Sequence, residues 1–332
     1  MRRVLAPPAT VRADQTSPPS FSVAIAAYQA AGFIAEAIES ALEQTYAPLE
    51  VIVCDDGSTD DLDRALAPYR DRISVLRKDN GGEASAKNAA VKAARGDFIA
   101  ILDADDVYDP TRLEAVAEAI RSRPDLDIVT TDCRIVVDGR FVRTCYVGDY
   151  RFETGDQRAG ILQRNFLGPG HMAVRREALL REDGFDESFR HATDWDCWIR
   201  MILSGSRAGL VDEPLAEYRV RATSLASDRL RQFDGYVAVL QKAAARDDLL
   251  PHERTTVEES LVRQKRRRRL RAAELALADR RPDARRLAFE IALEPGFPIR
   301  ERLRSAAAAV LPGLAGRRLR RAGPELAGGT RR

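Results

Sequence analysis

Residues 51–61 read VIVCDDGSTDD, an apolar run that passes directly into two aspartates and a Gly-Ser-Thr turn. Residues 98–110, FIAILDADDVYDP, have the same arrangement further along the chain. A short apolar run bounded by turn residues is typical of a buried strand. Because carboxylates follow two such strands, the sequence predicts a polar site at one edge of a sheet.

Strand and helix patterns alternate outward from these two stretches. Strands are expected at 21–28, 49–56, 72–78, 97–106 and 126–133. Helices are expected at 31–46, 58–69, 81–96 and 109–124, and a hairpin at 133–153 around Asp-Gly-Arg. This alternation predicts an α/β fold with a mostly parallel sheet flanked by helices. In such sheets ligands bind beyond the carboxyl ends of the strands, where both aspartate pairs fall.

Composition divides the 332-residue chain into three parts. Residues 1–20 are rich in Pro, Ser and Thr and predict a disordered lead-in. Residues 21–222 hold the strand–helix alternation, and residues 223–332, rich in Ala, Leu and Arg, predict a helical C-terminal region. Residues 261–332 carry 20 Lys and Arg against 7 Asp and Glu, a net charge of +13, whereas residues 1–260 carry 33 against 44, a net charge of −11. This difference in charge predicts an acidic catalytic part and a basic tail that binds an anionic partner.

Several classes of protein are disfavoured by the composition. The four cysteines form no CxxC pair and there are three histidines, which argues against a zinc site or a disulfide framework. No apolar run reaches the roughly 18 residues of a membrane span, and the N-terminus lacks the apolar core of a signal peptide. We therefore expect a cytoplasmic protein. The acidic body contains no recognised nucleic-acid module, so no nucleic-acid partner is expected.

Asp103 and Asp105 are the first candidate metal ligands. They lie two residues apart at the end of a predicted strand, so their side chains point the same way. Two such carboxylates suit Mg²⁺ or Mn²⁺, which bind oxygen ligands and substrate phosphates. The alternative for an isolated Asp-x-Asp is a polar turn that caps a helix. The second carboxylate pair, at the neighbouring strand end, favours the metal site.

Four stretches together resemble the family 2 glycosyltransferases, which have a GT-A fold. They are residues 23–61, 80–106, 184–200 and 218–227, within a similarity that covers residues 21–222. The resemblance implies a metal-dependent enzyme that moves a sugar from a nucleotide-diphosphate donor, with UDP as the first guess. The acceptor would be a hydroxyl of a glycan or a lipid-linked molecule in cell-surface polysaccharide assembly.

The resemblance also implies roles for individual residues on the donor side. Asp56 would bind the nucleotide base, and Tyr28 and the backbone near Ala26 would lie against that base. Lys87 would sit near the nucleotide or its phosphates. Asp103 would approach the ribose and the metal.

Asp105 would hold the metal on the diphosphate, and Asp194 matches the catalytic base of the family. A carboxylate within hydrogen-bond reach can take the proton of an acceptor hydroxyl, which is otherwise a poor nucleophile. With one base and no enzyme nucleophile, a single displacement inverts the anomeric carbon. Asp194 also precedes an apolar helix pattern, so an ordinary helix N-cap is the alternative.

The sequence departs from the family pattern at three places. Residues 26–29 are Ala-Ala-Tyr-Gln where Pro-x-Tyr-Asn is usual, and Thr precedes Asp194 where a second carboxylate is usual. Arg221 stands where a histidine often follows the Tyr-Arg pair. Its positive charge suits a diphosphate, and a surface arginine is the alternative. His171, in the stretch GPGHMA, either contacts the acceptor or is a solvated loop histidine.

Two questions stay open at this level. The basic tail either lies on an anionic membrane surface, which would make the protein peripheral on the inner face of the plasma membrane, or is a solvated helical extension or oligomer contact. The competing functions are a nucleotidyltransferase on a similar sheet and a non-catalytic scaffold. Residues 26–33, AAYQAAGF, lack the Gly-rich basic loop that a nucleotidyltransferase generally has.

Overall fold

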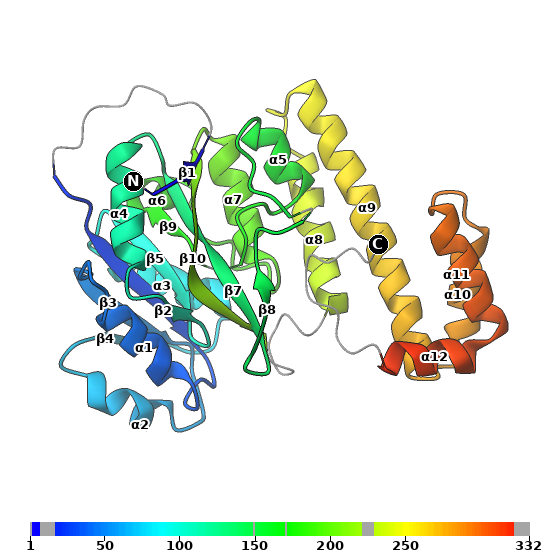
Figure 1. The fold of residues 1–332 in the computed structure, drawn as a ribbon, viewed down its shortest axis with the longest axis horizontal. Helices are drawn as coiled ribbons and strands as arrows, with labels where there is room; N and C mark the ends of the chain where they lie inside the picture. The colour runs from blue at the N-terminus through cyan, green and yellow to red at the C-terminus, as the bar shows by residue number, and fades with distance from the viewer. Residues whose placement is uncertain (1, 7–16, 149, 170, 221–228, 322–332) are drawn as a thin grey trace. The chain divides into compact units, whose positions relative to one another are not determined.

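A computed structural model describes residues 2–6, 17–148, 150–169, 171–220 and 229–321. The chain separates into two compact units, Met1–Arg221 and Ala222–Arg332. The first unit carries a sheet flanked by helices, and the second is helical (Figure 1).

Among the described residues the first unit contains one mixed sheet of ten strands. Its strands are β1 Val4–Leu5, β2 Phe21–Ala27, β3 Glu50–Asp55, β4 Ser74–Arg77, β5 Phe98–Asp103, β6 Val107–Tyr108, β7 Ile128–Val137, β8 Arg140–Thr144, β9 Ala173–Arg175 and β10 Ala208–Val220. Their order is β1-β10-β7-β9-β5-β2-β3-β4, with β6 beside β10 and β8 beside β7.

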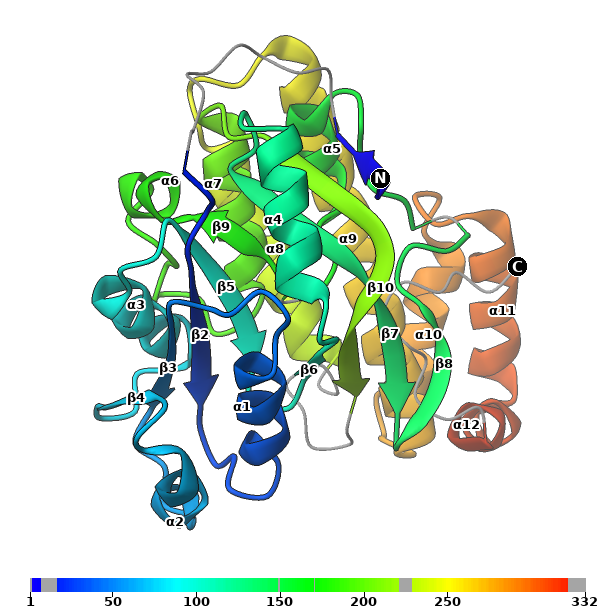
Figure 2. The same ribbon diagram turned by 60° about the vertical axis from the view of Figure 1, so that its left-hand side comes forward.

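Parallel pairing brings several strand ends to one edge of this sheet. The pairs β2–β3, β2–β5, β3–β4 and β7–β10 are parallel. Because β9 is antiparallel to both β5 and β7, those two strands also run in the same direction. The arrowheads of β2, β5, β7 and β10 accordingly point to a common edge (Figure 2). The predicted mostly parallel α/β sheet is thereby confirmed.

The helices of the first unit follow the strands as the periodicity predicts. They are α1 Ile34–Leu42, α2 Leu62–Leu66, the 3₁₀ turn η1 Ala67–Tyr69, α3 Glu83–Ala93, α4 Arg112–Ser122, α5 Gln157–Gln163, α6 Arg176–Arg181 and α7 Thr193–Leu203. α1 buries Ile34, Ala37, Ile38 and Ala41, which is one face of a helix. α3 packs on β2 and β3, and α4 packs on β7 and β10 (Figure 2).

Two parts of the sheet differ from expectation. The sequence predicts disorder for the lead-in 1–20, yet Val4 and Leu5 pair with Val211 and Leu210 as strand β1, while residues 1 and 7–16 lie outside the described residues. The edge of β10 offers unpaired backbone groups, and a short apolar segment satisfies them. The short strand β9, also unexpected, lies between β5 and β7. The predicted hairpin is confirmed, since Asp138 and Gly139 both have positive φ at the β7–β8 turn.

The second unit is built from α-helices over its described residues, which confirms the predicted helical region. They are α8 Arg229–Ala244, α9 Pro251–Ala278, α10 Ala284–Leu293, α11 Ile299–Val310 and α12 Pro312–Arg321. The long helix α9 packs against α8, α10 and α12, with small side chains such as Ala276, Ala284 and Ala288 at the contacts. No helix in the described ranges combines the length and the apolar character needed to cross a bilayer.

Candidate active site

The strand register brings the aspartates of the two opening stretches together. Ala26 on β2 is the Cα partner of Cys54 on β3 and of Asp103 on β5. Asp55 and Asp56 follow Cys54 directly, so they reach the same edge as Asp103. The carboxylates that lie far apart in the sequence therefore meet at the carboxyl ends of three adjacent parallel strands.

Lys87 links this edge to helix α3. Its side chain is 4% exposed, its Nζ lies 2.9 Å from Asp103 Oδ1, and it also bonds Glu83 one turn earlier. Burial lowers the pKa of Lys87, but the carboxylates of Asp103 and Glu83 outweigh burial and the net pKa is raised. Lys87 is thus a fixed cation between two carboxylates. Sequence reasoning did not single out Glu83, although its place four residues before Lys87 puts it on the same helix face.

Asp194 lies in the first turn of α7, within electrostatic reach of the same cluster. Burial raises the pKa of Asp194 to about 6, with Lys87 lowering it and Glu83 and Asp103 raising it. A carboxylate of this pKa is ionised at neutral pH yet remains an effective proton acceptor. The N-cap alternative is wrong, because the N-cap of α7 is Ala192 and no side chain caps the helix there.

The turn after β5 exposes two carboxylates and buries a third. Asp103 and Asp105 are both partly exposed, whereas Asp106 is 1% exposed. Asp106 Oδ2 lies 2.7 Å from His171 Nε2, and its Oδ1 accepts a hydrogen bond from Arg219 N at 2.8 Å. The partly exposed oxygens of Asp103 and Asp105 are the ligand type that Mg²⁺ and Mn²⁺ require, so these residues fit the predicted metal. Asp106 instead anchors the turn to β10.

Comparison with known proteins identifies a family to which the sequence of the first unit is similar. Residues 22–183 match the family described as Glycosyl transferase family 2. The chain contains a glycosyl transferase family 2 domain. The match selects glycosyl transfer over the nucleotidyl transfer weighed as its competitor.

Relatives of this glycosyltransferase domain occur among bacterial proteins. An uncharacterised glycosyltransferase of Rickettsia prowazekii is 29% identical over 66% of this chain and 69% of its own length. The chondroitin synthase of Pasteurella multocida is 33% identical over 56% of this chain, which corresponds to 19% of that larger protein.

Two solved structures share the fold across most of the chain. Residues 1–349 of TarS from S. aureus, in complex with UDP-GlcNAc, align with a TM-score of 0.62 and 19% identity, over 91% of each chain. The mannosyltransferase PcManGT from Pyrobaculum calidifontis, in complex with GDP-Man and Mn²⁺, aligns with a TM-score of 0.59 and 22% identity. That alignment covers 94% of this chain and 86% of the other.

The two residues expected at the nucleotide base differ in accessibility. Tyr28 is 53% exposed, as a ligand-facing ring requires. Asp56 is 2% exposed and accepts hydrogen bonds from the backbone N–H groups of Gly81 and Gly82, at 2.9 and 2.7 Å, and from Lys78 Nζ. A buried carboxylate needs such partners. Asp56 in the glycosyltransferase domain therefore holds the loop before α3 and is not open to a ligand.

His171 is buried, so it is not a solvated loop histidine. Its side chain is 1% exposed and lies edge-on to the rings of Tyr108 and Tyr218. The buried carboxylate of Asp106 requires a polar partner and His171 supplies it, and the acceptor contact stays a prediction. Arg221, the other expected contact, lies outside the described residues.

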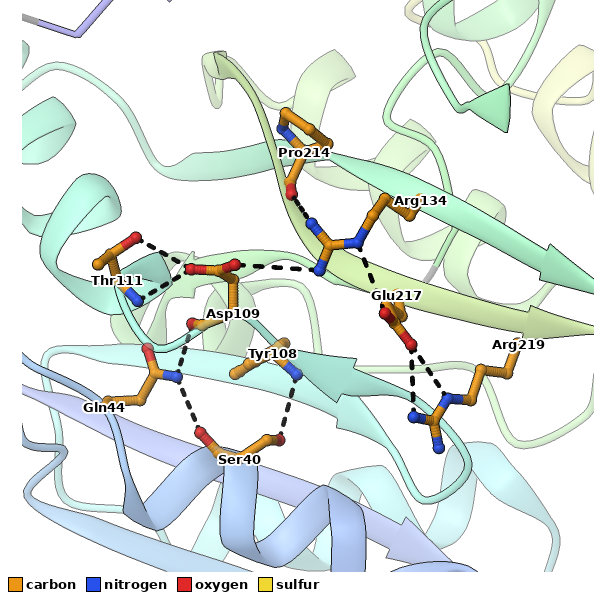
Figure 3. A network of polar contacts seen from close by, with 9 residues as sticks. All are labelled: Ser40, Gln44, Tyr108, Asp109, Thr111, Arg134, Pro214, Glu217 and Arg219. Atoms are coloured by element: carbon orange, nitrogen blue, oxygen red, sulfur yellow. Dashed lines mark hydrogen bonds and ion pairs between the residues drawn. The ribbon is translucent and has the colours of Figure 1, made fainter. Parts of the chain in front are cut away.

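A network of polar side chains lies between the segment that follows β6 and strands β7 and β10 (Figure 3). Arg134 of β7 donates to the carbonyl of Pro214 and pairs with Asp109 and Glu217. Arg219 pairs with Glu217 on its own strand and, at 2.7 Å, with Glu36 of α1. The network joins β7, β10 and the segment after β6, so the turn that carries Asp105 is held from several elements.

Proposed function

We propose that this chain transfers a sugar from a nucleoside-diphosphate sugar to a hydroxyl group of an acceptor, with inversion at the anomeric carbon. The observation that carries the proposal is the electrostatic interaction of Asp194 with Lys87, Glu83 and Asp103 at the carboxyl edge of the sheet. It unites a proton acceptor with an edge of carboxylates suited to a metal–diphosphate. A family 2 domain spans most of this edge.

The chemistry of the step follows from these groups. The acceptor oxygen forms a bond to the anomeric carbon while the bond from that carbon to the diphosphate oxygen breaks. The hydroxyl proton goes to Asp194, and the bonding electrons leave with the diphosphate. A single displacement of this kind inverts the configuration of the anomeric carbon. The pKa of about 6 lets Asp194 accept the proton near neutral pH.

The donor side is proposed around the turn after β5. Asp103 and Asp105 would hold Mg²⁺ or Mn²⁺, which supplies positive charge to the diphosphate as it departs. Lys87 keeps Asp103 in place from the protein side through its 2.9 Å contact. Tyr28, next to the backbone of Ala26, is proposed to lie against the base. UDP is the first choice of nucleotide, supported by the UDP-GlcNAc complex of TarS, and GDP is the second, supported by the GDP-Man complex of PcManGT.

The acceptor is proposed to be a glycan or a lipid-linked molecule in cell-surface polysaccharide assembly. The relative named chondroitin synthase supports a glycan acceptor. We place the reaction in the cytoplasm, at the inner face of the plasma membrane, where a lipid-linked acceptor would present its sugar.

The second unit is proposed to bind the anionic inner face of the plasma membrane through helices α10–α12. The exposed apolar side chains of these helices include Phe289, Leu293, Ile299, Leu303, Val310 and Leu314. On α11, Ile299, Leu303 and Val310 follow a helical stripe, and the exposed Arg300 and Arg304 adjoin it. Apolar side chains flanked by arginines match the lipid–headgroup boundary of an anionic bilayer. We call this the α10–α12 surface.

Thermal unfolding with Mn²⁺ and a panel of nucleoside diphosphates tests the transferase proposal. A ligand at about 100 times its Kd adds about 2.7 kcal/mol to the free energy of unfolding. We expect stabilisation by one nucleotide in the presence of Mn²⁺, and its loss in Asp105→Ala. Asp71→Ala is the matched control, because Asp71 is an exposed carboxylate just before the amino end of β4. Failure of every nucleotide to stabilise the folded protein would favour the scaffold instead.

A further inference from the structure

Asn165 is a residue near Asp194 that neither the family pattern nor the sequence motifs single out. It lies in the segment between α5 and β9, 29 residues before Asp194. Its Nδ2 donates a hydrogen bond to Asp194 Oδ2 at 3.1 Å. A neutral amide therefore faces the carboxylate that the proposed reaction uses as its base.

Both ends of the Asn165 side chain are engaged. The carbonyl Oδ1 accepts a hydrogen bond from the backbone N–H of Leu167 at 3.3 Å. Because that end must be an acceptor, the amide nitrogen faces Asp194 as a donor. The orientation of the amide is thus set by its own loop, independently of any ligand.

Two tyrosines hold the backbone of this loop. The hydroxyl of Tyr150 donates to the carbonyl of Asn165 and accepts from Gly168 N at 3.1 Å. The hydroxyl of Tyr146 donates to the carbonyl of Phe166 at 2.9 Å, and the two tyrosine rings stack with centroids 5.5 Å apart. The loop is therefore supported on the side chains that follow β8, and Asn165 has little freedom to move away from Asp194.

We propose that Asn165 is a positioning residue for the transfer step, which orients the Asp194 carboxylate and favours its ionised form. This inference rests on the proposed function, in which Asp194 takes the acceptor proton. A base is most effective when a third group fixes its orientation. A neutral donor does so with a smaller loss of basicity in Asp194 than a cationic donor would cause.

The charged groups around Asp194 explain why a donor is needed there. Glu83 and Lys87 face it from α3, and Asp103 faces it from β5. On its own helix, Asp196 is paired with Arg200 at 2.8 Å. Burial and the carboxylates of Glu83 and Asp103 disfavour the ionised form, while Lys87 and the N–H of Trp195 favour it. Asn165 adds a further hydrogen bond to the ionised form.

The test is a titration of Asp194 in the full chain by ¹³C NMR, with aspartate labelled at the carboxyl carbon. The Asp194 signal is assigned by its absence in Asp194→Asn. Asn165→Asp keeps the acceptor for Leu167 N but replaces the donor by a carboxylate of the same shape. We expect Asp194 in this variant to titrate about one pH unit or more higher, and in Asn165→Ala to shift in the same direction by less.

Tyr150→Phe is the control, because it loosens the loop while leaving the Asn165 amide unchanged. It should lower the melting temperature without a comparable shift in the Asp194 titration. The inference is overturned if Asp194 titrates alike in wild type, Asn165→Asp and Asn165→Ala, or if Tyr150→Phe shifts it as much as Asn165→Asp. The proposed function fails separately, if Asp194→Asn releases nucleoside diphosphate from UDP- and GDP-sugars as fast as wild type.

Discussion

At the scale of single residues, the carboxylates of this edge differ in what surrounds them. Asp103 is paired with Lys87 at 2.9 Å, Asp56 is bonded to a backbone loop, and Asp194 is partly buried with a raised pKa. The same side-chain type thus serves as a metal-ligand candidate, a structural anchor and a base candidate. Environment, more than residue type, separates these roles.

Asp194→Asn should lower the rate of sugar transfer by about 10²- to 10⁴-fold, the usual contribution of a general base. The wild-type rate should rise with pH through about 6, as Asp194 loses its proton. Rates measured from pH 5 to 8 with the stabilising nucleotide as sugar donor check both expectations. A variant with the wild-type rate and profile would remove Asp194 from the mechanism.

Asp194→Asn should lower the rate of sugar transfer but raise the stability of the fold above about pH 6. The pKa of Asp194 is raised above its unfolded value, so its contribution to stability is fully present at pH below about 4 and is lost as pH rises through about 6. Asp194→Asn removes this loss. We expect the variant to melt higher than wild type at pH 8, with the gain shrinking toward pH 4. A melting difference that does not depend on pH would contradict this account.

At the scale of elements, the turn between β5 and β6 depends on Asp106. This carboxylate is buried and links the turn to His171 before β9 and to Arg219 on β10. Asp103 and Asp105, on the same turn, are partly exposed. Within four residues, exposure thus distinguishes Asp103 and Asp105, which a ligand can reach, from Asp106, which holds the turn.

Asp106→Ala should lower the free energy of unfolding by about 1–3 kcal/mol, because it leaves the buried His171 nitrogen and Arg219 N–H without their partner. It should also weaken Mn²⁺-dependent stabilisation by nucleotide, since the turn loses its anchor. Urea unfolding of the metal-free protein separates the two effects. Asp105→Ala is the matched variant: because Asp105 is partly exposed, it should lose the metal effect with a smaller fall in the free energy of unfolding than Asp106→Ala, and equal destabilisation by both changes would contradict the distinction.

At the scale of the whole molecule, the charge is divided between the two units. Residues 1–221 carry 28 Lys and Arg against 37 Asp and Glu, a net charge of −9, and residues 222–332 carry 25 against 14, a net charge of +11. The second unit has a core that includes several alanines and exposes larger apolar side chains on α10–α12. This composition supports the proposed binding of the second unit to an anionic bilayer surface.

The α10–α12 surface should bind vesicles that contain phosphatidylglycerol and not vesicles of phosphatidylcholine alone. Each arginine near an anionic surface contributes about 1 kcal/mol, so Arg300→Gln with Arg304→Gln should weaken binding roughly tenfold to thirtyfold. Co-sedimentation of the full chain measures this.

The exposed pair Arg72→Gln with Arg140→Gln, in the first unit, is the control and should bind as wild type does. Equal loss in both pairs would indicate a response to net charge alone. Dimerisation without vesicle binding would assign the surface to a second copy of the chain.

The sequence by itself determined the alternation of strands and helices, because apolar periodicity is a local property of the chain. It also determined that Asp55, Asp56 and Asp103 follow apolar strands, whereas the strand order places β2 between the two strands that carry them. Only the tertiary structure decided that β9 separates β5 from β7, that Val4 and Leu5 cover the edge of β10, and that Asn165 meets Asp194. These contacts join residues far apart in the chain, and they depend on strand order and register, which local periodicity does not encode.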